Sequence, residues 1–105
     1  MKAVNALSQE SARIAAIETS DYVNAYILGG AAVTVTVPTG ATVAAFSSTT
    51  NFFANWKTTA TVPGANITNG TSSELNPSSR AVIAGGTFSV IAPAAGVLTI
   101  AFYNR

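Results

Sequence analysis

The stretch "AVTVTVP", Ala32 to Pro38, alternates valine with threonine along most of its length. Successive side chains of an extended strand point to opposite faces of a sheet, so the valines share one face and the threonines share the other. This alternation is typical of an antiparallel strand with one face on a core and one face in water. We therefore expect a half-buried strand in which Val33, Val35 and Val37 face the core.

A turn signal, Pro38-Thr39-Gly40, follows this strand directly. Proline fixes its own φ and glycine tolerates positive φ, so the chain is expected to reverse within a few residues. The next β-prone segment covers residues 42–47. Because short connections usually join antiparallel neighbours, we expect these two strands to pair as a hairpin.

The same period of two continues through most of the chain from Tyr22 onward, with β-branched and aromatic residues between Gly and Pro turn signals. Candidate strands cover residues 22–28, 32–37, 42–47, 51–57, 81–84, 87–91 and 97–103. No helical pattern separates them. They predict an all-β domain over residues 21–105, either an antiparallel β-sandwich or a small jelly roll.

The terminal stretch "GVLTIAFYNR", Gly96 to Arg105, is apolar on both faces of its expected strand. A sheet face of this kind is usually covered, either by the second sheet of a sandwich or by another subunit. One face carries Leu98, Ile100 and Phe102, and the other carries Val97, Thr99, Ala101 and Tyr103.

Residues 1–20 have a different pattern, rich in alanine and containing several charges. Ser8 is a suitable N-cap for a helix that runs from Gln9 to about Glu18. Glu18 interrupts the apolar face of that helix. Two alternatives stay open for this separate segment, an extended arm or a short helix docked on the domain or on a partner. Polar residues soon follow Lys2, so we expect no cleaved signal peptide and synthesis in a cytoplasm.

The composition argues against several function classes. The 105 residues are 49% hydrophobic and only 9% charged, with a net charge of +1 and no histidine or cysteine. No basic cluster is present for nucleic acid, and no apolar run reaches the ~20 residues of a membrane span. The usual transition-metal ligands and the parts of a Ser-His-Asp triad are missing, and no acid pair stands out. We expect no cofactor and no enzymatic activity.

Charges are absent from residues 22–56 and from residues 81–104. Charged side chains on exposed edge strands normally prevent pairing with other chains. A β domain without them has little protection against association, so we expect a homo-oligomer in which fellow subunits cover the edges.

The polar stretch "SSELNPSSR", Ser72 to Arg80, holds the only acid and one of the few bases in this part of the chain. We interpret Glu74 and Arg80 as an ion-paired clamp that fixes a long loop, within the chain or across a subunit boundary. A solvent-exposed coincidence and a binding site are the alternatives. Because Asn76 precedes Pro77, we expect Asn76 to be extended.

The aromatic stretch "NFFANWK", residues 51–57, has two interpretations. Most of its aromatic side chains are expected in the core or at a subunit interface. In the alternative, Phe53 and Trp56 stack on a sugar ring at a neutral surface. Tyr103 is a further candidate interface aromatic.

The run from Phe46 to Arg80, together with "FSVIAPAAGVLTIAFY", resembles a group of small virion proteins of tailed bacteriophages. The resemblance covers about residues 22–103, and the first twenty residues lie outside it. It departs from the group at Asn69, where an acid is common, and at Trp56 and Lys57, where smaller polar residues occur. The matching positions are Phe46, Phe53, Val62, Pro63, Gly70, Thr71, Ser73, Glu74, Leu75, Asn76, Pro77, Arg80, Ile91, Ala92, Pro93, Phe102 and Tyr103.

This resemblance implies a structural protein that decorates or cements the capsid. It implies a location on the capsid surface of the virion after synthesis in the cytoplasm of a bacterial host. The implied partners are the major capsid protein or other virion proteins. Because capsids offer three-fold sites, a homotrimer is the favoured assembly. The alternative function is a receptor- or glycan-binding module of a head fibre, tail or adhesin.

Overall fold

The computed structural model describes residues 22–104 of the chain. The segment 1–20, expected to be an arm or a short helix, lies outside the described residues. The described part contains strands and no helix, which confirms the all-β prediction. The strands are β1 (Tyr22–Leu28), β2 (Val33–Thr36), β3 (Val43–Ser48), β4 (Phe53–Asn55), β5 (Glu74–Leu75), β6 (Ser79–Ala81), β7 (Thr87–Ile91) and β8 (Gly96–Tyr103).

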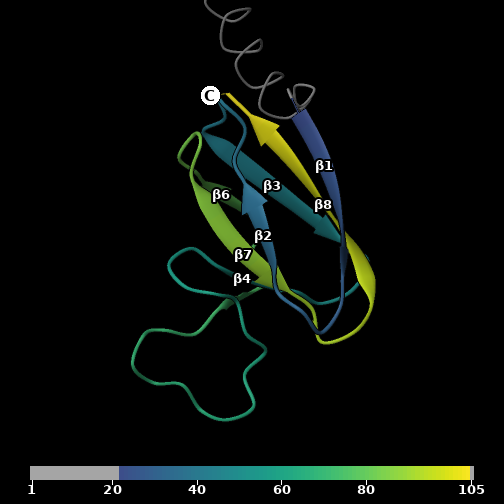
Figure 1. Ribbon diagram of the computed structural model, residues 1–105, viewed down its shortest axis with the longest axis vertical. Helices are drawn as coiled ribbons and strands as arrows, with labels where there is room; N and C mark the ends of the chain where they lie inside the picture. Colours follow the sequence, from purple (N-terminus) through teal and green to yellow (C-terminus); the bar gives the residue numbers. More distant parts are fainter. Residues whose placement is uncertain (1–21, 105) are drawn as a thin grey trace, which may run out of the picture.

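These strands form two four-stranded sheets, the two layers of a small β-sandwich (Figure 1). Sheet A has the order β1-β8-β3-β6, and sheet B has the order β2-β7-β4-β5. Every strand pairing is antiparallel. The expected antiparallel sandwich is therefore the observed architecture.

The core lies between the sheets and follows the alternation seen in the sequence. In and just after β2, Val35 and Val37 are buried, Val33 is half-buried, and Thr34 and Thr36 are exposed. The alternate residues of β8 also face the core. The largest fully buried side chains are Phe102, Leu98, Ile100, Val35 and Val90.

The expected hairpin between β2 and β3 is wrong. β2 pairs with β7 in sheet B, whereas β3 pairs with β8 and β6 in sheet A. The turn at Gly40, where φ is 87°, carries the chain from one sheet to the other. On the sheet B side, the Val37 N–H donates to the Gly86 carbonyl at 2.8 Å. On the sheet A side, the Thr42 N–H donates to the Tyr103 carbonyl at 2.9 Å. β2 and β3 therefore belong to opposite sheets, although each buries one face in the same core.

The strand prediction also differs from the structure around the polar loop. The segment 81–84 was expected as a strand, but β6 covers Ser79–Ala81, and the two-residue β5 was not expected at all. The expected strand 51–57 is shortened to Phe53–Asn55. β5 and β6 are edge strands and most of their residues are exposed, so they lack the apolar alternation by which a sequence reveals a strand.

The sandwich has two different flanks. The ion-paired flank consists of the short edge strands β5 and β6, which the contact between Glu74 and Arg80 brings together. The open flank consists of the edge strands β1 and β2, joined by the short connection 29–32. Neither β1 nor β2 contains a charged residue or a proline.

Candidate functional site

The structure brings Glu74 and Arg80 together across the two sheets. Glu74 lies on β5 opposite Ala54, and Arg80 lies on β6 opposite Ala44. Both alanines are fully buried, so the two charged residues occupy the inward-facing rows of their edge strands. The Arg80 Nε donates to both carboxylate oxygens of Glu74 at 3.1 Å, and its Nη2 also contacts Oε2. The pair thus connects the edge of sheet A to the edge of sheet B.

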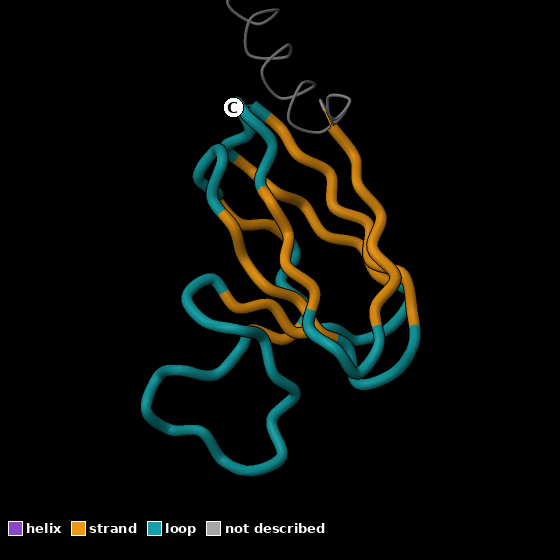
Figure 2. The backbone as a smooth tube through the Cα atoms, viewed as in Figure 1, coloured by secondary structure: helices purple, strands orange, loops and turns teal. Residues whose placement is uncertain are grey.

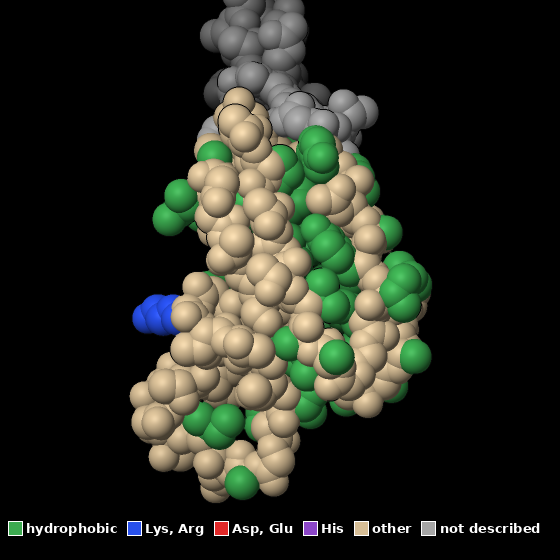
Figure 3. All heavy atoms as spheres, viewed as in Figure 1, with side chains coloured by type: hydrophobic (Ala, Val, Ile, Leu, Met, Phe, Trp, Pro, Cys, Tyr) green, Lys and Arg blue, Asp and Glu red, His purple; other side chains and the backbone are tan. Residues whose placement is uncertain are grey.

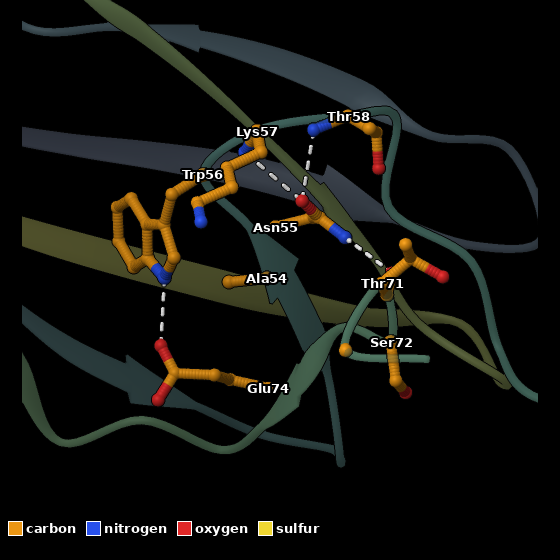
Figure 4. Close-up of a pocket in the computed structure, with 9 residues that line it drawn as sticks. Ala54, Asn55, Trp56, Lys57, Thr58, Thr71, Ser72 and Glu74 are labelled. Atoms are coloured by element: carbon orange, nitrogen blue, oxygen red, sulfur yellow. Dashed lines mark hydrogen bonds between the residues drawn. The ribbon is translucent and has the colours of Figure 1, made fainter. Parts of the chain in front are cut away.

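Trp56 completes this arrangement from the end of β4. Its indole N–H donates to Glu74 Oε1 at 2.6 Å (Figure 4). Its ring packs inward, with centroid distances of 4.4 Å to Phe88 and 6.0 Å to Phe46. The tryptophan therefore joins the carboxylate on the ion-paired flank to the aromatic part of the core.

The pKa of Glu74 is lowered by the hydrogen bonds from Arg80 and, to a smaller extent, from Trp56, against a weaker opposing effect of burial. The same pairing raises the pKa of Arg80. An ionised carboxylate that accepts bonds on both oxygens is well suited to hold neighbouring groups in place. It is poorly suited to exchange a proton near neutral pH.

Replacing Glu74 with glutamine should remove the pH dependence that this carboxylate contributes. Because its folded pKa lies below the ordinary value of 4.5, the stabilisation is present above that value and is lost as pH falls through the folded pKa. The Glu74 side chain is 38% exposed, so we expect at most about 1 kcal/mol near neutral pH. Urea unfolding followed by the fluorescence of the single tryptophan can measure this.

The two proteins should differ at pH 7, and the difference should disappear as the pH falls below the folded pKa of Glu74, because a protonated carboxyl is uncharged like the amide that replaces it. If the unmodified chain and Glu74→Gln have the same free energy of unfolding at each pH, the ion pair does not stabilise the fold. A gap that widens on acidification would contradict the lowered pKa of Glu74.

Asn76 is not extended, contrary to the expectation from Pro77. Its φ is 48°, in the left-handed region that asparagine tolerates better than most residues. The Asn76 N–H donates to the Phe52 carbonyl, and the Phe52 N–H donates to Asn76 Oδ1, both at 2.9 Å. These two bonds prolong the pairing of β4 with β5 and offset the unfavourable backbone geometry. Pro77 itself is buried.

The long loop between β4 and β5, residues 56–73, is held at its base by Asn55. Its Oδ1 accepts bonds from the N–H groups of Lys57 at 3.0 Å and Thr58 at 2.9 Å. Its Nδ2 donates to the Thr71 carbonyl at 3.4 Å (Figure 4). The same Nδ2 also donates to Ser73 Oγ at 3.2 Å. One side chain therefore binds both ends of the loop.

Ser89 provides a second anchor next to Asn55, its neighbour in the pairing of β4 with β7. Its Oγ accepts a bond at 2.8 Å from the N–H of Ala60, a buried residue of the loop. Asn55 and Ser89 are the buried polar residues of the described part of the chain. Neither was predicted as a site residue. The signal available in the sequence was an asparagine at a strand end, which often bonds the next backbone N–H groups.

Beyond these anchors, residues 61–72 are exposed without interruption, and the loop projects from the body of the sandwich (Figure 2). It leaves the end of the molecule opposite the end at which β1 begins (Figure 1). Val62 and Ile67 are each 38% exposed on it. Near the C-terminal end of the loop, Asn69 Oδ1 accepts a bond from Thr71 Oγ1 at 2.7 Å.

A hollow of about 260 Å³ lies between the two ends of this loop (Figure 4). The side chains of Asn55 and Glu74 are engaged in the bonds described above, so among residues 22–104 the Lys57 ammonium is the free charge beside the hollow. Residues 22–104 contain no cluster of acidic, histidine or cysteine side chains that could hold a metal ion. The hollow is lined by Ala54, Asn55, Trp56, Lys57, Thr58, Gly70, Thr71, Ser72 and Glu74.

The three candidate aromatic residues do not form one surface. Phe53 is half-buried on the outer face of sheet B, and Trp56 packs inward. Tyr103 is half-buried on the outer face of sheet A, opposite Val43. The structure therefore places Phe53 and Tyr103 on opposite outer faces and Trp56 against the core between the sheets.

Within residues 22–104, no helix is long and apolar enough to cross a membrane. No protein-family model matches the chain, and neither the curated proteins nor the solved structures contain a match.

Proposed function

We propose that this chain is a structural virion protein of a tailed bacteriophage that decorates or cements the capsid through β contacts between subunits. The resemblance of residues 22–103 to small virion proteins suggested this role. The structural observation that supports it most is the outer face of sheet A, which is broad, uncharged and not covered by any other part of residues 22–104.

The outer face of sheet A follows from the strand register. Its rows contain small and aliphatic side chains together with one tyrosine, and no charged residue. On β1 the face has two strongly exposed aliphatic residues, Val23 at 54% and Ile27 at 77%. Its members are Val23, Ala25, Ile27, Val97, Thr99, Ala101, Tyr103, Val43, Ala45, Ser47, Ser79 and Ala81.

Covering such a face is energetically favourable. At about 25 cal/mol per Å², burying even ~400 Å² of apolar surface contributes roughly 10 kcal/mol before the cost of association. A partner must bring no unpaired charge to this face, because desolvating a charge without compensation is costly. Fellow subunits meet that condition. A homo-oligomer, with the trimer favoured by capsid symmetry, bound to the major capsid protein or another virion protein fits these requirements.

The alternative function, a receptor- or glycan-binding module, is supported by a different feature. Trp56 packs inward and away from Phe53, so the two rings offer no joint surface for stacking on a sugar. The projecting loop 56–73, anchored by Asn55 and fully exposed over residues 61–72, suits contact with a host surface.

Binding to phage heads tests the proposed function. The chain should co-sediment with heads of the encoding phage that were prepared without it. Ala101→Lys, at the centre of the outer face of sheet A, should weaken this binding at least tenfold. Thr36→Lys, on the exposed outer face of sheet B, is the matched control and should bind like the unmodified chain.

Two outcomes would reject the capsid role. The first is an unmodified chain that does not bind heads, and the second is an Ala101→Lys chain that binds as tightly as the control. If Ile67→Ser leaves the particle assembled but abolishes adsorption to host cells, the receptor-binding alternative is the better account.

A further inference from the structure

The two flanks of the sandwich are protected to different degrees against pairing with another chain. On the ion-paired flank, β5 and β6 have two and three residues, and their inward-pointing Glu74 and Arg80 bind each other. Short strands and inward-pointing charges are devices that protect sheet edges. On the open flank, β1 has seven residues, no charge and no proline. Its pairing with β8 is continuous from Tyr22 to Leu28 without a bulge.

β1 therefore presents a regular and unprotected sheet edge. Within residues 22–104 it pairs with β8 on one side and with no strand on the other. Every second residue of such a strand directs its backbone N–H and C=O groups away from the sheet. In Figure 3, hydrophobic side chains gather on the side of the molecule where β1 runs, and the basic side chain visible in this view lies on the opposite side.

The sequence of β1 is complementary to itself in one antiparallel register. If two copies meet about a two-fold axis at Ala25, Val23 of each copy lies opposite Ile27 of the other. These two residues are 54% and 77% exposed on the same outward row, so the pairing would cover the most exposed aliphatic groups of the strand. In the same register Asn24 lies opposite Tyr26, a polar match, and alanine meets alanine at the axis.

We propose that β1 pairs with β1 of a second copy, antiparallel and centred on Ala25, so that the two A sheets become one continuous eight-stranded sheet. The self-complementary register and the absence of charge identify the second copy as the partner, because a charged strand would bring uncompensated charge to this edge. This pairing specifies one contact of the self-association in the proposed function, and it rests on that self-association. It does not depend on the capsid, and its two-fold symmetry makes it a contact distinct from the favoured three-fold one.

Disulfide trapping tests both the contact and its register. The chain has no cysteine, so every cross-link reports an introduced residue. Opposite residues of antiparallel strands have Cα atoms about 4.5–5.5 Å apart, which is within disulfide range. Ala25→Cys should therefore form a covalent dimer on mild oxidation. Ile27→Cys alone should not, because its two copies would lie about 13 Å apart along the strands.

An equimolar mixture of Val23→Cys and Ile27→Cys chains should cross-link in pairs of unlike chains, because these two positions face each other in the proposed register. Failure of Ala25→Cys to cross-link at a concentration where the chain self-associates would overturn the proposal. So would equally efficient cross-linking of Ile27→Cys alone.

Native mass spectrometry provides a readout that needs no cysteine. The unmodified chain should form assemblies with even numbers of copies. Ile27→Lys should at least halve the size of these assemblies, whereas Ile83→Lys should not change it. Ile83 is the matched control because it is also an isoleucine and is 82% exposed, but it lies outside β1.

A chain that remains a monomer, or that forms only trimers, would overturn the β1 pairing. If those trimers still bind phage heads, the proposed function stands without it. Conversely, a cross-linked dimer that ignores phage heads would support the β1 pairing and reject the capsid role.

Discussion

Replacing Phe102 with alanine is expected to lower the free energy of unfolding by about 3–5 kcal/mol, the largest effect we predict for a single substitution. Phe102 is fully buried in β8, which is an inner strand of sheet A between β1 and β3. Removing the ring forfeits its transfer from water and leaves a cavity that the neighbouring strands cannot easily fill. A domain of this size is stable by only about 5–15 kcal/mol, so the substitution removes a large share of its stability.

The measurement is urea unfolding followed by Trp56 fluorescence, with the melting temperature as a second readout. Phe53→Ala is the matched control, because it removes the same ring from a half-buried position on the outer face of sheet B. It should cost less than half as much as Phe102→Ala. Equal losses from the two substitutions would mean either that the core does not lie between the sheets or that a partner buries the outer face of sheet B.

The alternation in β8 could be read from the sequence and grouped Phe102 with Leu98 and Ile100, but both faces of the strand are apolar, so it did not show which face lies in the core. The alternation also did not show whether β2 and β3 are neighbours in one sheet or belong to opposite sheets. Both arrangements bury Val35 and Ala44, and both are compatible with a turn at Gly40. The choice depends on the distant segments β7 and β8, which supply the strand partners.

The polar residues of the candidate site were predictable to unequal extents. Glu74 and Arg80 stood out because charges are rare in this chain, so opposite charges close in sequence suggested a pair. Their role in connecting two sheets did not follow, because β5 and β6 were not recognised as edge strands. Asn55 is uncharged and does not stand out in this way from the many other polar residues of the chain. It lies in the outward row of β4, where an asparagine is normally solvated, and it becomes buried only because the loop 56–73 folds over it.

These polar contacts are unevenly distributed over the sandwich. The ion pair closes the flank of β5 and β6, while the β1 edge and the outer face of sheet A are left without charge. The loop 56–73 projects from the end opposite the start of β1 (Figure 1). Association through sheet A is therefore compatible with a loop that stays accessible, and its accessibility depends on the rigidity that Asn55 gives to its base.

Replacing Asn55 with alanine should release that loop. The substitution removes four hydrogen bonds, each with a net contribution of about 0.5–1.5 kcal/mol, but water can reach the exposed partners Lys57, Thr58 and Thr71. We therefore expect a loss of about 2 kcal/mol in the free energy of unfolding. Local opening of the loop base should become easier by a similar amount, equivalent to roughly a tenfold to thirtyfold larger open population.

Trypsin reports this opening directly. Lys57 is the only lysine or arginine between Arg13 and Arg80, so cleavage in the loop has a single site. The bond that is cut joins Lys57 to Thr58, and Asn55 Oδ1 binds the N–H groups of both residues. Cleavage at Lys57 should therefore accelerate about tenfold or more in Asn55→Ala under conditions where both proteins are folded.

Two variants separate the anchoring role from a general loss of stability. Asn55→Asp keeps the acceptor for Lys57 and Thr58 but loses the donor to Thr71 and Ser73, so its cleavage rate should lie between those of the unmodified chain and Asn55→Ala. Asn66→Ala changes an exposed asparagine of the same loop and should leave the rate unchanged. If Asn55→Ala loses stability while cleavage at Lys57 stays as slow as in the unmodified chain, Asn55 supports the sheet and does not hold the loop.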